Sequence, residues 1–321
     1  MKKYLPLIVL AVLAVLPLIG LSTYTMHMII LVIMWATVGM AWNLLAGYCG
    51  QVSFGHAAYF GVGAYTSGIL YSHLNMSPWW GIPISIVVVT IFSFLLGLMV
   101  LRLRGPFFTL ATLAMGEVMR VTAENLVWLT GGSTGILIRE RTWIDKTHYY
   151  YIILAIAVVT FLVIKLLVRS KMGYYFMAIR EDQDAAESLG INTTLYKTIA
   201  LCISGALTGI AGAFYTNYMG YIDPEVVFAL HDVSIVTIMI VMVGGVATLS
   251  GPFVGAAIMV LLAELVRSQL ADLVRSMPSL GAAHQVFFGI LLILIIIFLP
   301  NGIVGDFQKI KRMFRVGGAC K

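Results

Sequence analysis

About ten apolar stretches, most of them close to 20 residues long, fill almost the whole of this 321-residue chain. A helix of roughly 18 or more apolar residues is long enough to cross the ~30 Å hydrocarbon core of a bilayer. The pattern therefore predicts an all-α, polytopic membrane protein with about ten transmembrane helices. The predicted spans are residues 5–21, 27–46, 57–73, 81–101, 107–128, 149–168, 198–218, 232–250, 253–272 and 284–300.

The composition excludes a water-soluble protein. The chain is 60% hydrophobic and 11% charged, whereas a soluble domain averages about 25% charged residues. No polar stretch is long enough to fold separately, so residues 1–321 are expected to form a single transmembrane domain. The three cysteines and six histidines are scattered and lack the spacing of disulfide frameworks or metal sites. We therefore expect no bound metal.

The distribution of positive charge predicts the orientation of the chain. If the N-terminus is cytoplasmic, most of the 20 basic residues fall in segments on the inner face. Loops rich in Lys and Arg stay in the cytoplasm during insertion, so both termini are expected to be inside. The stretch 5–21 resembles a signal peptide but lacks a small-x-small cleavage site, and we expect it to remain as a first helix. The inner basic residues are Lys2, Lys3, Arg102, Arg104, Lys165, Arg169, Lys171, Arg180, Lys197, Lys309, Lys311, Arg312, Arg315 and Lys321.

The segment between the second and third predicted spans, residues 47–56, is rich in glycine and carries polar side chains. One interpretation is an interrupted or re-entrant backbone, which is tolerated at membrane depth only where protein or a water-lined cavity satisfies its polar groups. Transporters aim such broken helices at their substrates. The other interpretation is an ordinary short turn followed by a glycine-rich packing helix. The candidate residues for a translocation path here are Gly50, Gln51, Ser53, Gly55 and His56.

The fifth predicted span carries three charged residues on one face. Glu117, Arg120 and Glu124 follow one another at intervals of three and four residues, so each carboxylate can pair with the guanidinium along a helix. A charged side chain at bilayer depth costs several kcal/mol unless it is paired or hydrated. We expect this face to meet protein or water rather than lipid, and Glu117 and Arg120 are further candidates for the path. The alternative is an ion pair that is satisfied within its own helix.

A polar island, residues 169–197, interrupts the apolar stretches and is expected to be a cytoplasmic loop that contains a short helix. Asp182 is a suitable N-cap and Gly190 a suitable stop. Between them, Ala185, Ala186 and Leu189 are expected to form a small apolar face. A two-turn helix is not stable alone in water, so it requires a partner surface.

This island resembles a known motif. Asp184, Ala185 and Ala186, followed after three residues by Gly190, are similar to the EAA loop of ATP-binding-cassette importer permeases. Asp replaces the usual Glu, and the downstream Ile-x-Leu-Pro is missing, which points away from the maltose-like permeases. Four stretches together resemble the M-type permeases of the bacterial high-affinity branched-chain amino acid importer family. They are Trp42 to Gly63, Arg104 to Ala114, Thr130 to Gly135 and Ala178 to Glu181.

The resemblance implies a permease domain over residues 1–321 in a bacterial inner-membrane complex. The complex would contain a second permease, two ATPase subunits and a periplasmic amino-acid-binding protein, and would import branched-chain amino acids by alternating access. The chain has no G-x-x-x-x-G-K-[ST] phosphate loop, so we expect it to be no enzyme and to bind no cofactor, with ATP and Mg²⁺ used by its partners. The residues expected to couple to the ATPase are Arg180, Asp184, Ala185, Ala186, Leu189 and Gly190.

Other functions remain open at this stage. A urea or short-chain amide permease would share the glycine-rich segment. An ion-coupled secondary transporter would use Glu117 and Glu264 as coupling groups and would need no ATPase. A channel or membrane enzyme is disfavoured, because the sequence shows neither a selectivity-filter repeat nor a clustered nucleophile and base.

Overall fold

The structure is a computed structural model that describes residues 13–138, 145–276, 289 and 302–305. Within these ranges the chain is almost entirely helical, apart from two short strands that pair with each other. The predicted all-α fold is therefore confirmed. Nearly all of the predicted span 284–300 and the first part of the predicted span 5–21 lie outside the described residues.

Five stretches of the described chain are long and apolar enough to cross a membrane. They coincide with the predicted spans that begin at residues 27, 81, 149, 198 and 232. The predicted spans 57–73, 107–128 and 253–272 also coincide with helices. The chain is thus a multi-pass membrane protein. The five stretches are Thr23–Tyr48, Pro78–Val100, Lys146–Arg169, Thr193–Met219 and Pro224–Gly244.

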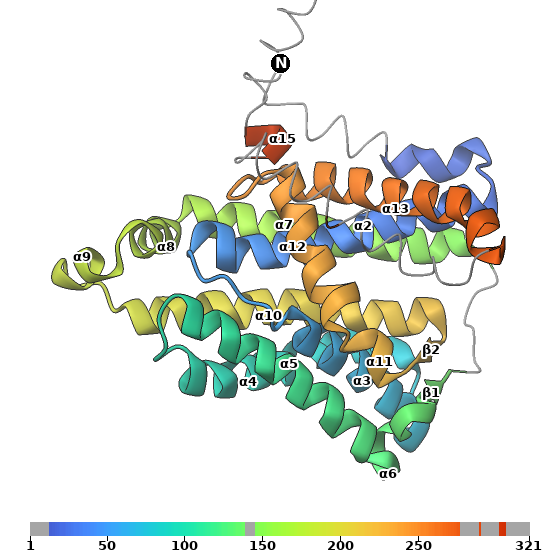
Figure 1. Ribbon diagram of the computed structural model, residues 1–321, viewed down its shortest axis with the longest axis horizontal. Coiled ribbons are helices and arrows are strands. Elements are labelled where there is room, and N and C mark those ends of the chain that lie inside the picture. The colour runs from blue at the N-terminus through green and yellow to red at the C-terminus, as the bar shows by residue number, and fades with distance from the viewer. Residues whose placement is uncertain (1–12, 139–144, 277–288, 290–301, 306–321) are drawn as a thin grey trace, which may run out of the picture.

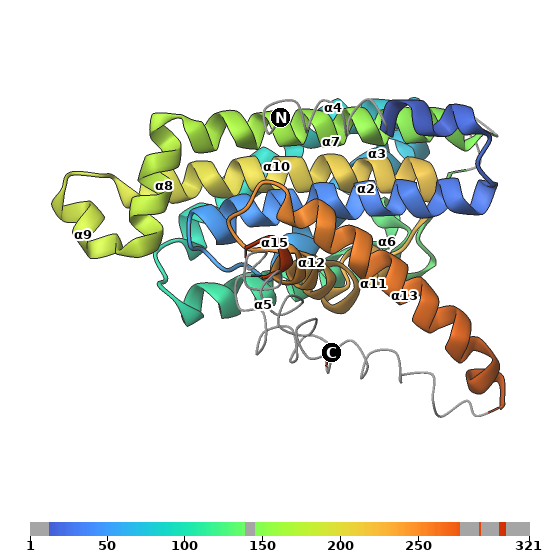
Figure 2. The ribbon, with the colours of Figure 1, turned by 90° about the horizontal axis from the view of Figure 1, so that it is seen from above.

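The long helices form two layers (Figure 1). Helices α2, α7 and α13 lie in one layer, helices α3, α4, α5 and α10 lie in the other, and α12 crosses between them. Figure 2 shows α2, α7 and α10 running along the long axis of the molecule, with α13 crossing them obliquely. The long helices are α2 (Thr23–Asn43), α3 (His56–Leu74), α4 (Gly81–Val100), α5 (Pro106–Asn125), α7 (Lys146–Arg169), α10 (Thr193–Met219), α12 (Val236–Gly244) and α13 (Gly251–Ser276).

Short elements connect the long helices. A two-stranded antiparallel sheet pairs β1 (Ile136–Leu137) with β2 (Tyr221–Ile222) and ties the α6–α7 connection to the end of α10. The short helical elements are the 3₁₀ turns Leu16–Ile19, Pro78–Trp80 and Gly132–Thr134, the π-helices Leu44–Tyr48 and Leu230–Ile235, and helices α6 (Val127–Thr130), α8 (Lys171–Glu181), α9 (Gln183–Ser188), α11 (Pro224–Val227) and α15 (Gly302–Gly305).

Helix α10 packs most closely against α3 and α4, and glycines permit this approach. A Cβ atom added at Gly63 would overlap the backbone of Gly209, and one added at Gly212 would overlap the carbonyl oxygen of Phe60. Small residues at such crossings let membrane helices gain dispersion contacts along their backbones. The close α3–α10 contact therefore positions the beginning of α3, which follows an interruption in the chain.

Two predicted spans end differently in the structure. The second span continues past residue 46 as a π-helix to Tyr48, and residues 49–55 are then not helical. The predicted span 232–250 is wrong at its end, because α12 stops at Gly244. Gly245 has φ +131° and Ala247 has φ +55°, and these backbone conformations do not continue an α-helix. The chain therefore departs from helical structure at two places inside the bundle, after the π-helix that follows α2 and after α12.

The close α3–α10 contact predicts the effect of substituting Gly212. We expect Gly212→Ala to lower the free energy of unfolding by about 1–3 kcal/mol, because the added methyl group overlaps the Phe60 carbonyl and forces the helices apart. Thermal unfolding of the detergent-solubilised protein measures the change. Gly116→Ala on α5 is the matched control, because no described atom lies within 4 Å of its added Cβ. Equal melting temperatures for the two variants would contradict this packing argument.

Candidate functional site

Helix α9 lies beyond the end of the bundle, past the ends of α7 and α10 (Figure 1), and we call this side the α9 end. Its limits agree with the prediction. The side chain of Asp182 accepts a hydrogen bond of 3.0 Å from the Ala185 amide, which caps the N-terminus. At the other end Gly190 has φ +83°, and the Ile191 amide donates to the Ala186 carbonyl at 3.1 Å. Both predicted boundary residues are therefore confirmed.

Helix α8, which precedes α9, was not predicted within the polar island. Its residues Phe176 and Ile179 are buried, and α8 packs against α7 and α10. The signal was present in the sequence, because Met172, Phe176 and Ile179 are spaced by four and three residues and so share one helix face. The island is thus a pair of short helices, of which the first is anchored to the bundle.

The predicted apolar face of α9 is wrong as a single surface. Ala186 is only 2% exposed and belongs to the hydrophobic core of the chain, whereas Leu189 is 81% exposed. Ala185 is also exposed. The reason is that α9 lies against α8 and α10, which turns Ala186 inward. Ala185 and Leu189, four residues apart, remain on the outer side.

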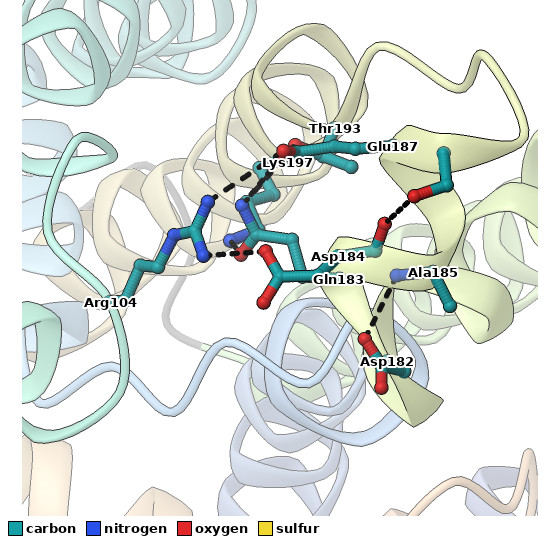
Figure 3. Close-up of polar contacts among 9 residues, drawn as sticks. Arg104, Asp182, Gln183, Asp184, Ala185, Glu187, Thr193 and Lys197 are labelled. Atoms are coloured by element: carbon teal, nitrogen blue, oxygen red, sulfur yellow. Dashed lines mark hydrogen bonds and ion pairs between the residues drawn. The ribbon is translucent and has the colours of Figure 1, made fainter.

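A polar network holds the inner side of α9 (Figure 3). Arg104, on the connection between α4 and α5, donates to Asp184 Oδ1 at 2.7 Å and lies 3.6 Å from Glu187 Oε2. Glu187 Oε1 accepts hydrogen bonds from Gln183 at 2.8 Å and from Thr193 at 2.5 Å. Lys197 on α10 donates to the Gln183 side chain. Side chains therefore link helix α9 to the α4–α5 connection and to α10.

The network fixes the charge of two of its members. The hydrogen bond to Asp184 raises the pKa of the Arg104 guanidinium above its ordinary value. Hydrogen bonds from Gln183 and then from Thr193 hold the pKa of Glu187 below its ordinary value. Both shifts favour the charged forms, so Arg104 and Glu187 carry opposite charges throughout the neutral range.

Arg180, at the end of α8, contacts the predicted path segment. Its Nη1 donates to the carbonyl oxygen of Gly47 at 3.1 Å, and its guanidinium also pairs with Glu181. Gly50, with φ +73°, packs against it so closely that a Cβ there would lie 2.9 Å from Arg180 Cγ. The structure therefore brings a residue expected to couple to the ATPase into contact with residues 47–50.

Residues 49–55, which we call the broken segment, lie between the π-helix that ends at Tyr48 and helix α3 and are not helical. Side chains from α5 bind its backbone: Thr109 Oγ1 donates to the Val52 carbonyl at 2.9 Å, and Thr112 Oγ1 accepts from the Phe54 amide at 3.1 Å. Ser234 Oγ donates to the Phe54 carbonyl at 2.6 Å. The indole of Trp42 donates to the Ser53 carbonyl at 2.8 Å. Protein groups thus satisfy these four backbone groups of the broken segment, as burial in a membrane requires.

The residues of the broken segment differ in exposure, and Gly50 and Val52 are exposed. Ser53 and Gly55 are buried and Gln51 is half-buried. The Ser53 hydroxyl accepts from the Gly55 amide at 3.1 Å, and the Gln51 amide donates to the Leu45 carbonyl at 3.0 Å. These predicted path residues therefore form one continuous turn that leads into α3.

His56 begins α3 and is fully buried. Its Nε2 lies 2.9 Å from Ser204 Oγ on α10, and the same hydroxyl donates to the Ala41 carbonyl at 2.6 Å. Because the Ser204 proton is used in that bond, the hydroxyl oxygen accepts from His56 Nε2–H. His56 thus joins α3, α10 and α2 at the interruption.

The charged face of α5 contains the predicted ion pairs. Arg120 Nη2 lies 2.5 Å from Glu117 Oε1, and Arg120 Nη1 pairs with Glu124. Within the single chain, 54% of the Glu117 side chain is exposed, and about a quarter of each of the other two is exposed. Apolar side chains on α5, such as Leu110 and Val118, are also exposed. This face of α5 is therefore open in the isolated chain.

The sequence reasoning missed a second irregular segment, residues 245–250 between α12 and α13. Asn43 binds it twice: Oδ1 accepts from the Ala247 amide at 2.8 Å, and Nδ2 donates to the Thr248 carbonyl at 2.9 Å. A Cβ at Gly47 would lie 2.8 Å from the same Ala247 nitrogen. As in the broken segment, several glycines could have indicated this turn in the sequence: Gly244, Gly245 and Gly251 flank it.

These observations define a class of protein: a multi-pass, all-α membrane protein with interrupted helices and a capped helix beyond one end of the bundle. Residues 24–296 match the family described as branched-chain amino acid transport system, permease component. The chain belongs to this family. It is therefore a transport component that works with other components of a transport system.

Two relatives cover most of the chain. It is 28% identical to the high-affinity branched-chain amino acid transport system permease protein LivM of Escherichia coli over 332 residues, which is 94% of this chain and 75% of the relative. It is 24% identical to the high-affinity branched-chain amino acid transport system permease protein BraD of Pseudomonas aeruginosa over 293 residues, 84% of this chain and 91% of the relative. No solved structure is significantly similar to it.

The contact between Gly50 and Arg180 predicts a transport defect. We expect Gly50→Ala to reduce amino-acid uptake by about tenfold or more, because its methyl group would displace Arg180 as well as strain the backbone. Uptake of radiolabelled leucine by cells that produce equal amounts of the variants measures the effect. Gly105→Ala is the matched control, because Gly105 also has a positive φ, of +54°, but no described atom lies within 4 Å of its Cβ. Equal uptake by the two variants would reject this contact as functional.

Proposed function

We propose that the chain is one permease subunit of an ATP-binding-cassette importer that moves leucine, isoleucine and valine into the cytoplasm by alternating access. The observation that carries the proposal is α9. This two-turn helix is capped at both ends and seated by the buried Ala186, yet it exposes Ala185 and Leu189 beyond the bundle. So short a helix gains little stability from itself, and its outer side suits a groove on an ATPase.

The partners follow from what the chain lacks and from its family. The sequence contains no Walker-type phosphate loop, so two ATPase subunits would use ATP and Mg²⁺, while this subunit only couples their closure to transport. A second permease would complete the membrane unit, and a periplasmic amino-acid-binding protein would deliver the substrate. The names of LivM and BraD support the branched-chain substrate class.

In the proposed orientation, the chain spans a bacterial inner membrane and the α9 end faces the cytoplasm. Basic residues gather at this end, on the α4–α5 connection and around α8: Arg102, Arg104, Arg169, Lys171 and Arg180. The positive-inside rule then puts both termini on the same side, for a chain of about ten spans.

The broken segment is the proposed substrate-facing part of the path, as a re-entrant interruption near the middle of the membrane. Its position between α2, α5 and the π-helix at residues 230–235 supports this role. The exposed ion pairs of Glu117 and Arg120 on α5 would face the second permease or the water-filled path, because lipid would make their exposure costly.

The contacts of two acidic residues disfavour an ion-coupled secondary transporter. The Glu264 carboxylate accepts a hydrogen bond of 2.7 Å from the Tyr24 hydroxyl, and Glu117 is paired with Arg120. Neither is an isolated carboxyl group poised to carry a proton. A urea or amide permease gains no support either, since the matched family and both relatives carry the name of branched-chain amino acids.

The role of α9 predicts the effect of placing charged side chains on its outer side. We expect Ala185→Arg and Leu189→Glu to abolish copurification of the ATPase subunits, because both change the outer side of α9. Membrane insertion should be unchanged, because both residues are exposed and do not support the fold. Pull-down of the tagged permease measures the bound ATPase. Leu195→Glu on α10, half-exposed near the same end, is the control and should retain the ATPase. Full retention by the Ala185 and Leu189 variants would refute docking through α9.

The energy source separates the proposed importer from a secondary transporter. In proteoliposomes that contain the complete transporter, leucine uptake is expected to require both internal ATP and the binding protein, and to persist when an ionophore dissipates ion gradients. Excess isoleucine or valine should compete with leucine, whereas excess urea should not. Uptake by the purified chain alone, driven by a proton or sodium gradient, would overturn the proposal.

A further inference from the structure

Arg104 occupies a position that the proposed path and coupling residues do not explain. It lies on the short connection between α4 and α5, two residues before Pro106, the first residue of α5. Eighty residues separate it from its partner Asp184 along the chain. The guanidinium is therefore attached to the start of one long helix and bound to a different short one.

The geometry of the contact restrains α9 at two points. Arg104 Nη1 lies 2.7 Å from Asp184 Oδ1, and Nη2 lies 3.6 Å from Glu187 Oε2 (Figure 3). Asp184 and Glu187 are three residues apart and so face the same side of α9. An arginine is suited to this arrangement because its planar fork presents two donors in fixed directions. The contact resists rotation of α9 as well as its translation.

The second carboxylate is held ready for this contact. Glu187 Oε1 accepts hydrogen bonds from Gln183 and Thr193, which leaves Oε2 directed toward Arg104. These hydrogen bonds also keep the pKa of Glu187 below its ordinary value. The carboxylate is thus ionised and oriented toward Arg104.

At its other end the linkage reaches the broken segment. Helix α5 begins at Pro106, two residues after Arg104, and its first turns hold the broken segment through Thr109 and Thr112. Thr109 and Thr112 are the third and sixth residues after Pro106, so one rigid helix connects the two contacts. A continuous series of contacts runs from α9 through Arg104 and α5 to residues 52–54.

We propose that Arg104 is a positioning residue that makes α9 and α5 move together, so that displacement of α9 by the ATPase reaches the broken segment through α5. This inference rests on the proposed function of α9 as the ATPase contact. The contact of Arg180 with Gly47 forms a separate link from α8 to the same region. Loss of Arg104 therefore weakens the coupling without abolishing it.

The exposure of the pair makes this role separable from folding. The side chains of Arg104 and Asp184 are 57% and 77% exposed, and exposed ion pairs contribute little to stability. We expect Arg104→Gln to insert and to bind the ATPase subunits as the wild-type chain does, but to lower the leucine transported per ATP hydrolysed by about fivefold. Arg104→Lys, which keeps the charge, should retain at least half of the wild-type amount of leucine transported per ATP hydrolysed.

The experiment is a mutant cycle on the complete transporter in proteoliposomes, with leucine, ATP and the binding protein. Arg104→Gln is compared in the wild-type chain and in a chain that already carries Asp184→Asn and Glu187→Gln. In the second background, Arg104→Gln is expected to cause no further decrease in the leucine transported per ATP hydrolysed, because the partners of Arg104 are already neutral. Arg102→Gln is the matched control, since Arg102 lies on the same connection, is exposed, and forms no ion pair within the described chain.

Each other outcome overturns the inference. Arg104 has another role if Arg104→Gln transports as much leucine per ATP as the wild-type chain, or if it lowers this ratio equally in both backgrounds. The same holds if Arg104→Gln fails to bind the ATPase. The proposed function itself is tested by the wild-type chain in the same proteoliposomes. If that chain shows no ATP-dependent uptake, the importer proposal fails; if it does and only the mutant cycle fails, the importer proposal stands without this link.

Discussion

The backbone of the broken segment is the constraint on which the rest of this structure depends. Amide and carbonyl groups without a helical partner are too costly to leave exposed to hydrocarbon. This chain satisfies them with hydroxyl and indole groups from three different elements: Thr109 and Thr112 of α5, Ser234 of the π-helix before α12, and Trp42 of α2. Because each of these contacts crosses between helices, the segment cannot change its shape unless α2, α5 or α12 changes position.

The same constraint explains why irregular backbone and close glycine contacts occur together. His56 is held to α10 through Ser204 at the level where α3 begins, and α3 can approach α10 closely because Gly63 on α3 and Gly212 on α10 have no side chains at the crossing. Asn43 in turn fastens the turn at residues 245–250 to the end of α2. The two irregular segments are thus joined to one packed centre. A transporter that alternates its access benefits from such an arrangement, since packed helices that move as rigid bodies around a fixed irregular segment keep its hydrogen bonds intact.

The sequence predicted those features that depend on neighbouring residues. Apolar length gave the membrane spans, and the caps of α9 at Asp182 and Gly190 followed from local hydrogen-bonding chemistry. Contacts between residues that are far apart along the chain could not be predicted from the sequence. Nothing in the island itself shows that Ala186 faces inward, because this depends on how α9 lies against α8 and α10. The bonds of Arg104 to Asp184 and of Arg180 to Gly47 connect residues 80 and 133 positions apart, and no periodicity reports such pairs.

The two arginines at the α9 end also indicate why this part of the chain contains two short helices rather than a simple loop. Helix α8 is fixed to the bundle by Phe176 and Ile179, and its last turn places Arg180 against Gly47. Helix α9 is fixed less firmly, because it buries only one alanine and is otherwise held by polar contacts. These are hydrogen bonds from Thr193 and Lys197 of α10 and exposed ionic contacts with Arg104, which precedes α5. A force applied to the outer side of α9 therefore acts on an element that is able to shift, while α8 supplies a fixed support beside it. Exposed ionic contacts suit this purpose better than a buried apolar seat would, because they tolerate small displacements at little cost and still direct the motion toward α5.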